Sequence, residues 1–161
     1  MVSIVVTPAQ GDSVDFLSAL LETWETEKTS GYAALTPEQR CLFNVNRFDY
    51  QMQNGGLHGF LLNTPCSHLA ETLADLRRVG ADSVRLLDLV VRELGGAVPQ
   101  NAARYFELLA QVIERGGLEG LVYEEHGLLK KLAAHLGLEE DRASGAAVGP
   151  GDGPAARKGR S

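Results

Sequence analysis

Cys66 and His68 are the residues best suited to chemistry, because a cysteine can serve as a nucleophile and both side chains can bind zinc. A zinc site needs three or four ligands, and no second Cys or His pair stands at a matching spacing. Residues two apart on a helix face different sides, so His68 is badly placed to act as a base for Cys66. We therefore predict no catalytic site, no metal site and no cofactor.

Three pairs of glycines could instead form phosphate-binding loops: 55–56, 95–96 and 116–117. None is followed by Lys and Ser or Thr, and none follows a strand pattern, which argues against both the P-loop and the dinucleotide fingerprint. The pairs at 95–96 and 116–117 are typical of helix ends.

The segment from Asn54 to Asn63 carries more glycine than a helix end requires. Gly55 and Gly56 are followed on a very short helix by Gly59, and three glycines would let another backbone or a ligand approach closely. Two interpretations stay open: tight packing between helices, or a surface for a ligand or partner. For a ligand, the polar contacts would come from Asn54, His58 and Asn63, and the walls from Tyr50 and Phe60.

Helices must position these residues, since apolar side chains recur at three- and four-residue spacing along most of the chain. The first helix is expected to be capped by Asp12 or Ser13 and to bury Val14, Leu17, Leu20, Leu21 and Trp24. Thr36 and Gln39 form a capping box for a second helix that buries Leu42, Val45, Phe48 and Met52 and ends at Asn54. Further helices are predicted over 57–62, 65–79, 82–94, 99–115 and 125–136.

The predicted fold class is therefore all-α, a single compact domain of about six or seven helices over residues 12–140. Residues 1–11 would form an N-terminal arm. Residues 141–161 are rich in Gly, Ala and Pro with a few bases, and we expect a disordered tail. The chain has no apolar run long enough for a membrane span, no basic N-terminal signal region and only two cysteines, so we expect a cytoplasmic protein.

The body of the chain is acidic: residues 1–140 hold eleven Lys and Arg against nineteen Asp and Glu, and the whole chain has a net charge of −6. An acidic surface repels phosphate, so direct nucleic-acid binding is not expected. Over 82–94 acids and bases alternate, which is typical of a solvated helix with ion pairs within it. Acids without interleaved bases gather in two places, the first helix with Glu22, Glu25 and Glu27 and the region near the end with Glu119, Glu124 and Glu125.

The motifs around the glycines resemble a bacterial all-helical family named for a DNA-mimic protein. The resemblance rests on Leu35 to Arg40, the NGG motif at 54–56 with Phe60 and Asn63, and the helix end at Val79-Gly80-Ala81. It implies an all-α fold and a protein that imitates duplex DNA to occupy a helix-turn-helix regulator. The family often has Glu where this chain has Gln51, and Gln where it has Gly59.

The leading functional hypothesis is a non-enzymatic module that binds another protein through its acidic helical surface. A DNA-binding regulator is one candidate for that partner. The alternative is a small-molecule-binding domain or enzyme with a pocket between Asn54 and Asn63. A third hypothesis is an immunity or antitoxin-like partner that also acts by occlusion.

Overall fold

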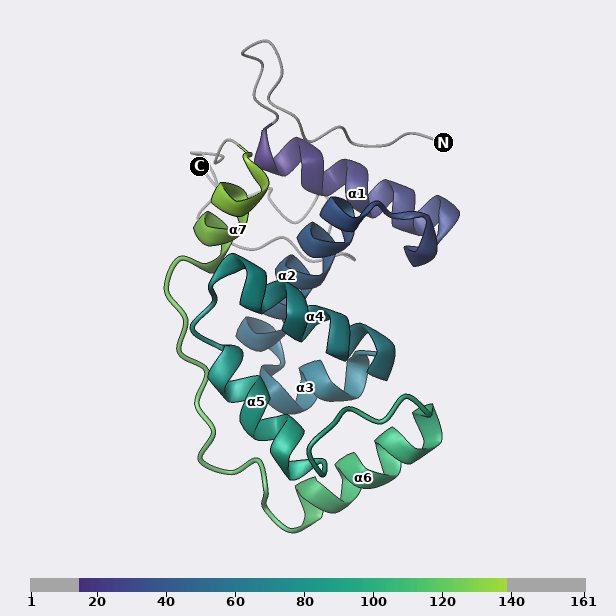
Figure 1. The fold of residues 1–161 in the computed structure, drawn as a ribbon, viewed down its shortest axis with the longest axis vertical. Coiled ribbons are helices and arrows are strands. Elements are labelled where there is room, and N and C mark those ends of the chain that lie inside the picture. The colour runs from purple at the N-terminus through teal and green to yellow at the C-terminus, as the bar shows by residue number, and fades with distance from the viewer. Residues whose placement is uncertain (1–14, 139–161) are drawn as a thin grey trace. The chain divides into compact units, whose positions relative to one another are not determined.

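The computed structural model describes residues 15–138, and the regular elements within that range are helices joined by turns and loops (Figure 1). The elements are α1 (Phe16–Ser30), the 3₁₀ helix η2 (Tyr32–Ala34), α2 (Pro37–Asn54), α3 (Gly56–Asn63), α4 (Cys66–Val79), α5 (Val84–Glu93), α6 (Ala102–Glu114) and α7 (Leu128–Leu136). The all-α prediction is confirmed. The predicted arm at 1–11 and the predicted tail at 141–161 lie outside the described residues. Among the described helices, none is both long and apolar enough to cross a membrane.

The described residues form two compact units. The first holds residues 15–50 and 127–138, with α1, η2, most of α2, and α7. The second holds residues 51–126, with the end of α2 and helices α3 to α6. The extent of a single domain over 12–140 stays a prediction.

The start of α2 confirms the predicted capping box. The backbone N–H of Gln39 donates to the Thr36 hydroxyl at 3.1 Å, and the N–H of Thr36 donates to the Gln39 side-chain oxygen at 2.9 Å. Gln39 is buried, so this reciprocal pair satisfies two N–H groups away from solvent. The sequence therefore fixes this helix start locally.

The predicted start of the first helix was wrong. Its cap is Asp15, whose carboxylate accepts from the N–H of Ser18 at 3.1 Å; Asp12, Ser13 and Val14 lie outside the described residues. The buried stripe is accordingly rotated. It consists of Phe16, Ala19, Leu20, Thr23 and Trp24, while Leu17 and Leu21 are only half-buried.

Two later helices also begin after their predicted starts, each for a local reason. α6 begins at Ala102 rather than Pro99, because the Asn101 side chain accepts from the N–H of Arg104 at 2.9 Å. α7 begins at Leu128 rather than at 125, because Gly127 has left-handed backbone geometry (φ +66°) and the Glu125 side chain binds elsewhere.

The predicted core of α2 is confirmed, since Leu42, Val45, Phe48 and Met52 are all buried. The periodicity did not reveal the polar side chains buried on the same helix, which are Gln39, Asn44, Asn46 and Asp49. On α4 the buried face holds Leu69, Leu76 and Val79 as predicted, but Thr72 and Asp75 take the place expected for Leu73.

The turn between α4 and α5 is closed by backbone hydrogen bonds around Gly80, which has left-handed geometry (φ +77°). The N–H of Gly80 donates to the Arg77 carbonyl at 3.2 Å, and that of Ala81 donates to the Leu76 carbonyl at 3.0 Å. This is the Schellman pattern, which satisfies carbonyls at the end of α4 and turns the chain toward α5.

The charges of α5 pair with other helices, contrary to the expected pairs within the helix. Asp88 accepts from Arg77 of α4 at 2.6 Å. Arg115, just after α6, donates to both the carbonyl and the carboxylate of Glu93, at 2.9 and 3.0 Å. These charges therefore link helices within the second unit.

Tyr105 of α6 is the largest fully buried side chain of the second unit. Its hydroxyl donates to the Leu61 carbonyl of α3 at 3.0 Å. Burial, together with the nearby Cys66 thiol, raises the pKa of Tyr105 to about 12. Tyr105 thus joins α6 to the end of α3 only while it stays protonated.

Replacing Thr36 with Ala should destabilise the protein by about 1 kcal/mol, because the N–H of Gln39 loses its acceptor. Urea denaturation of full-length protein measures the change. Thr29→Ala is the matched control, since the exposed Thr29 hydroxyl donates only to a carbonyl of its own helix. Equal effects of the two substitutions would contradict the capping role.

Stability should fall between pH of about 10 and about 12 as Tyr105 ionises. The pKa of Tyr105 is higher in the folded than in the unfolded state. The contribution of Tyr105 to the free energy of unfolding is therefore complete below the unfolded pKa of about 10, and it is lost as the pH rises through the folded pKa of about 12. Absorbance of tyrosinate against pH should show one late ionisation coupled to unfolding. Tyr105→Phe should remove that late step and cost about 1 kcal/mol at neutral pH, because the Leu61 carbonyl loses its donor. A late step that survives in this variant would contradict the assignment.

Candidate functional site

The acids predicted on α1 differ in their surroundings. Glu22 and Glu25 are exposed and make no ion pair with another described residue. Glu27 is half-buried, and its negative charge acts on Arg47 of α2. Burial lowers the pKa of Arg47, and the charges of Glu27 and Tyr32 partly oppose that shift. Glu22 and Glu25 are therefore the acids of α1 best placed to meet a partner.

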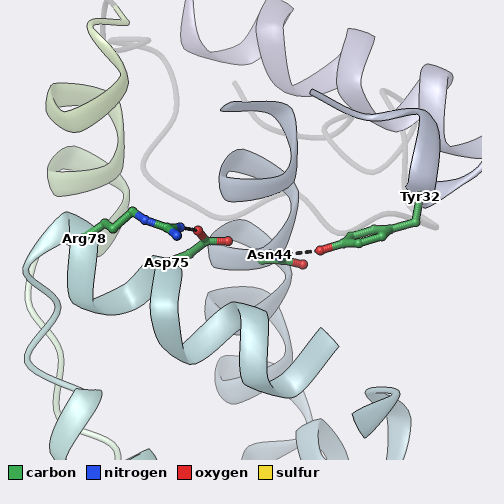
Figure 2. A network of polar contacts seen from close by, with 4 residues as sticks. All are labelled: Tyr32, Asn44, Asp75 and Arg78. Atoms are coloured by element: carbon green, nitrogen blue, oxygen red, sulfur yellow. Dashed lines mark hydrogen bonds and ion pairs between the residues drawn. The ribbon is translucent and has the colours of Figure 1, made fainter. Parts of the chain in front are cut away.

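Arg47 belongs to a cluster of cations and aromatic rings in the first unit. The guanidinium of Arg47 lies 6.0 Å from the centre of the Phe43 ring, and that of Arg40 lies 5.6 Å from the centre of the Tyr32 ring. The two rings meet edge to face at 5.8 Å. Figure 2 shows the Asn44 amide, which donates to the Tyr32 hydroxyl at 2.8 Å. These contacts hold η2 against α2 and place the bases of α2 against rings.

One acid of the second unit, Asp75, is buried and paired within its own helix. Asp75 of α4 is almost fully buried and forms an ion pair with Arg78, one turn further along the same helix (Figure 2). Because a buried carboxylate needs a partner, Asp75 is not part of the acidic surface.

The acids near the end of the described chain divide in the same way. Glu119 and Glu124 are exposed and make no ion pair with another described residue. The half-buried carboxylate of Glu125 accepts from the N–H of Ser83 at 2.9 Å and from that of Asp82 at 3.2 Å. The carboxylate thereby caps N–H groups that have no acceptor within the helix at the start of α5, where a negative charge is favourable. Glu125, predicted as a partner-binding acid, has a structural contact of its own.

These hydrogen bonds join α5 to the loop that precedes α7, which runs beside it in Figure 1. A pocket of about 600 Å³ lies between the start of α5 and residues 120–126 of this loop. Exposed Leu89 and Val122 line it, as do Arg85, Glu124 and His126.

The glycines of the NGG segment are not required by close packing. An added Cβ at Gly56 or Gly59 would meet nothing within 4 Å, and at Gly55 it would make ordinary contacts. Within the described residues, this counts against tight packing between helices as the reason for the glycines, whereas the surface for a ligand or partner stays a prediction. Gly56 is needed for its backbone geometry, since its φ of +72° is in the left-handed region.

The polar side chains of this segment face solvent. Asn54, His58 and Asn63 are exposed, Phe60 is buried, and Tyr50 is half-buried. Asn54 and Asn63 both take part in other interactions. The pocket described above is lined by none of these residues. The ligand pocket between Asn54 and Asn63 stays a prediction.

Cys66 and His68 occupy different environments at the start of α4, with Cys66 buried and His68 half-buried. Within residues 15–138, no three His, Cys, Asp or Glu side chains come close enough together to hold a metal ion. The thiol contributes to the raised pKa of Tyr105.

Sequence reasoning missed two buried polar side chains, one of which lines the pocket. Ser83 is buried and lines the pocket, yet its hydroxyl has no hydrogen-bond partner in the described part of the chain. Both polar atoms of the fully buried Asn46 amide likewise have no partner there. No local pattern signals either one, because burial of a polar group depends on contacts distant in sequence.

The described residues define a small all-helical fold with several exposed acids that form no ion pair with a base of residues 15–138. Residues 33–112 match the family model of DMP19-like proteins, named for DNA mimic protein 19. The matched segment runs from η2 to most of α6, and the match confirms the resemblance seen in the motifs. No curated protein and no solved structure matches the chain.

Removing the Glu125 carboxylate should destabilise the second unit by about 1–2 kcal/mol, because two N–H groups at the start of α5 lose their acceptor. Thermal or urea denaturation of Glu125→Ala measures this loss. Glu124→Ala is the control, as it removes the adjacent exposed acid and should change stability by less than about 0.5 kcal/mol. The capping role would be contradicted if the two variants were equally stable.

Proposed function

We propose that this chain is a non-enzymatic, cytoplasmic protein-binding module that acts as a DNA mimic. Its partner would be a DNA-binding regulator, of the helix-turn-helix class that the family resemblance implies, whose basic site it occupies. The match of residues 33–112 to the DMP19-like family carries this proposal. The acids that would meet the partner lie outside the matched segment, so their assignment rests on exposure and charge alone.

The spacing of the free acids supports mimicry on α1. Glu22 and Glu25 are three residues apart, which corresponds to a rise of about 4.5 Å along a helix. One strand of duplex DNA presents a charge about every 3.4 Å along its axis. A basic groove built for phosphates could therefore accept both carboxylates.

A second pair of free acids, Glu119 and Glu124, lies on the other unit. Each stands in or next to a segment without helix, where a side chain can adapt to a partner's arginine or lysine. The same region offers few bases, since Arg115 is paired with Glu93. We assign Glu22, Glu25, Glu119 and Glu124 as the partner-binding acids, with Glu27 and Glu125 supporting the fold beside them.

The proposal predicts that removing at least one of the two acid pairs lowers affinity for the partner and reduces the dependence of that affinity on salt. Two double variants test this: Glu22→Gln with Glu25→Gln, and Glu119→Gln with Glu124→Gln. At low salt at least one should bind the partner about five-fold more weakly, since each exposed charge contributes up to about 1 kcal/mol. Glu107→Gln with Glu114→Gln on α6 is the control with the same change of net charge, and it should bind as the unchanged protein does.

The partner is obtained by capture from host lysate on the full-length chain, with washes at low and then high salt and identification by mass spectrometry. The proposal expects a DNA-binding protein that is released by high salt and also by added duplex DNA. Capture of no such protein, or of one that duplex DNA does not release, would overturn it.

A further inference from the structure

The pocket between α5 and the loop at 120–126 gathers exposed apolar side chains. Four large apolar residues of the described chain are exposed, and two of them, Leu89 and Val122, line this pocket. Val122 is 65% exposed, so most of this residue is open to a partner. An aliphatic side chain from another molecule would remove both from water.

Ser83 adds an unused polar group to the same pocket. Its side chain is 2% exposed, and its hydroxyl has no hydrogen-bond partner among the described residues. The hydroxyl does not cap α5 either. A buried hydroxyl without a partner has a free-energy cost, which a ligand with a carbonyl or an N–H would remove.

The walls of the pocket are fixed by the fold. The Schellman turn at Gly80 sets the start of α5, and the Glu125 carboxylate holds the loop to the N–H groups of Asp82 and Ser83. The pocket is therefore largely formed before a ligand arrives, which lowers the entropic cost of binding.

Charge decides the class of ligand. Two carboxylates, those of Asp82 and Glu124, line the pocket against one guanidinium, that of Arg85, and the carboxylate of Glu125 lies beside it on the N–H groups of Asp82 and Ser83. Its volume of about 600 Å³ is that of a site for a few residues of peptide. A ligand with an aliphatic side chain, backbone amides and neighbouring positive charge complements the apolar wall, the Ser83 hydroxyl and the acidic rim together.

We propose that this pocket binds a short peptide segment of a partner protein, in which an aliphatic side chain is flanked by lysine or arginine. The aliphatic side chain lies between Leu89 and Val122, a backbone amide of the segment bonds the Ser83 hydroxyl, and a basic side chain lies near Glu124. The inference rests on the proposed function in taking the partner to be a basic protein, and it adds a specific apolar anchor to a charged surface.

Fluorescence anisotropy of labelled hexapeptides with the full-length protein tests this proposal. The probe alternates lysine and leucine; one control peptide replaces leucine with serine, and another replaces lysine with glutamate. The lysine–leucine peptide should bind, and both controls should bind at least about ten-fold more weakly. Equal binding of the serine peptide would show general charge attraction and overturn the proposal.

Substitutions in the pocket lining test whether the lysine–leucine peptide binds there. Val122→Ser should weaken the lysine–leucine peptide about ten-fold, and Ser83→Ala about three-fold. Leu62→Ser is the matched control, because Leu62 is also exposed but lies on α3 away from the pocket lining. Ser83→Ala should leave the thermal midpoint unchanged or raised, since the lost hydroxyl makes no bond in the described structure. Unchanged affinity in Val122→Ser and Ser83→Ala would overturn the proposal, as would an equal loss in Leu62→Ser.

The peptide experiment can fail or succeed independently of the test of the proposed function. If no peptide binds while the chain still captures a DNA-binding protein that salt and duplex DNA release, the pocket proposal is wrong and the proposed function stands. If the peptide binds as described but no DNA-binding protein is captured, the proposed function is wrong and the pocket remains a peptide site.

Discussion

The second unit depends on a carboxylate that reaches forty-two residues back along the chain. Glu125 accepts the N–H groups of Asp82 and Ser83, and so stabilises the start of α5 while fixing the loop that follows α6. The start of α5 has no side-chain cap of its own, so this distant acid takes that role. The pocket beside α5 lies between the two segments that this carboxylate joins.

The same contact shows how an acidic protein divides its charges between fold and surface. Asp75, Asp88 and Glu93 pair with arginines of the second unit, and Glu27 lies beside Arg47 in the first. The net charge of −6 therefore does not by itself show which carboxylates are available to a partner. A DNA mimic needs carboxylates that meet its partner, so Glu22, Glu25, Glu119 and Glu124 count for more in this proposal than the total charge does.

Much of the fold was predictable because its causes are local. The capping box at Thr36 and Gln39, the core stripe of α2 and the helix end at Gly80 all depend on residues within one or two turns. The starts of α6 and α7 also have local causes, the Asn101 cap and the left-handed Gly127, but apolar periodicity does not show them. The pairing of Asp88 with Arg77 and the role of Glu125 depend on contacts between distant segments, which periodicity does not contain. The same limit applies to the site: exposed acids could be selected from composition, whereas the buried Ser83 hydroxyl and the pocket around it could not.

The central structural claim is that Glu125 holds the loop to the start of α5, and amide hydrogen exchange of the full-length protein tests it most directly. In the unchanged protein the amides of Asp82 and Ser83 should exchange slowly, because each donates to a carboxylate oxygen. In Glu125→Ala they should exchange at least about ten-fold faster, while Tyr105 and its neighbours in α6 keep their protection. Exchange at Asp82 and Ser83 that is fast in the unchanged protein, or unaffected by the substitution, would contradict the account.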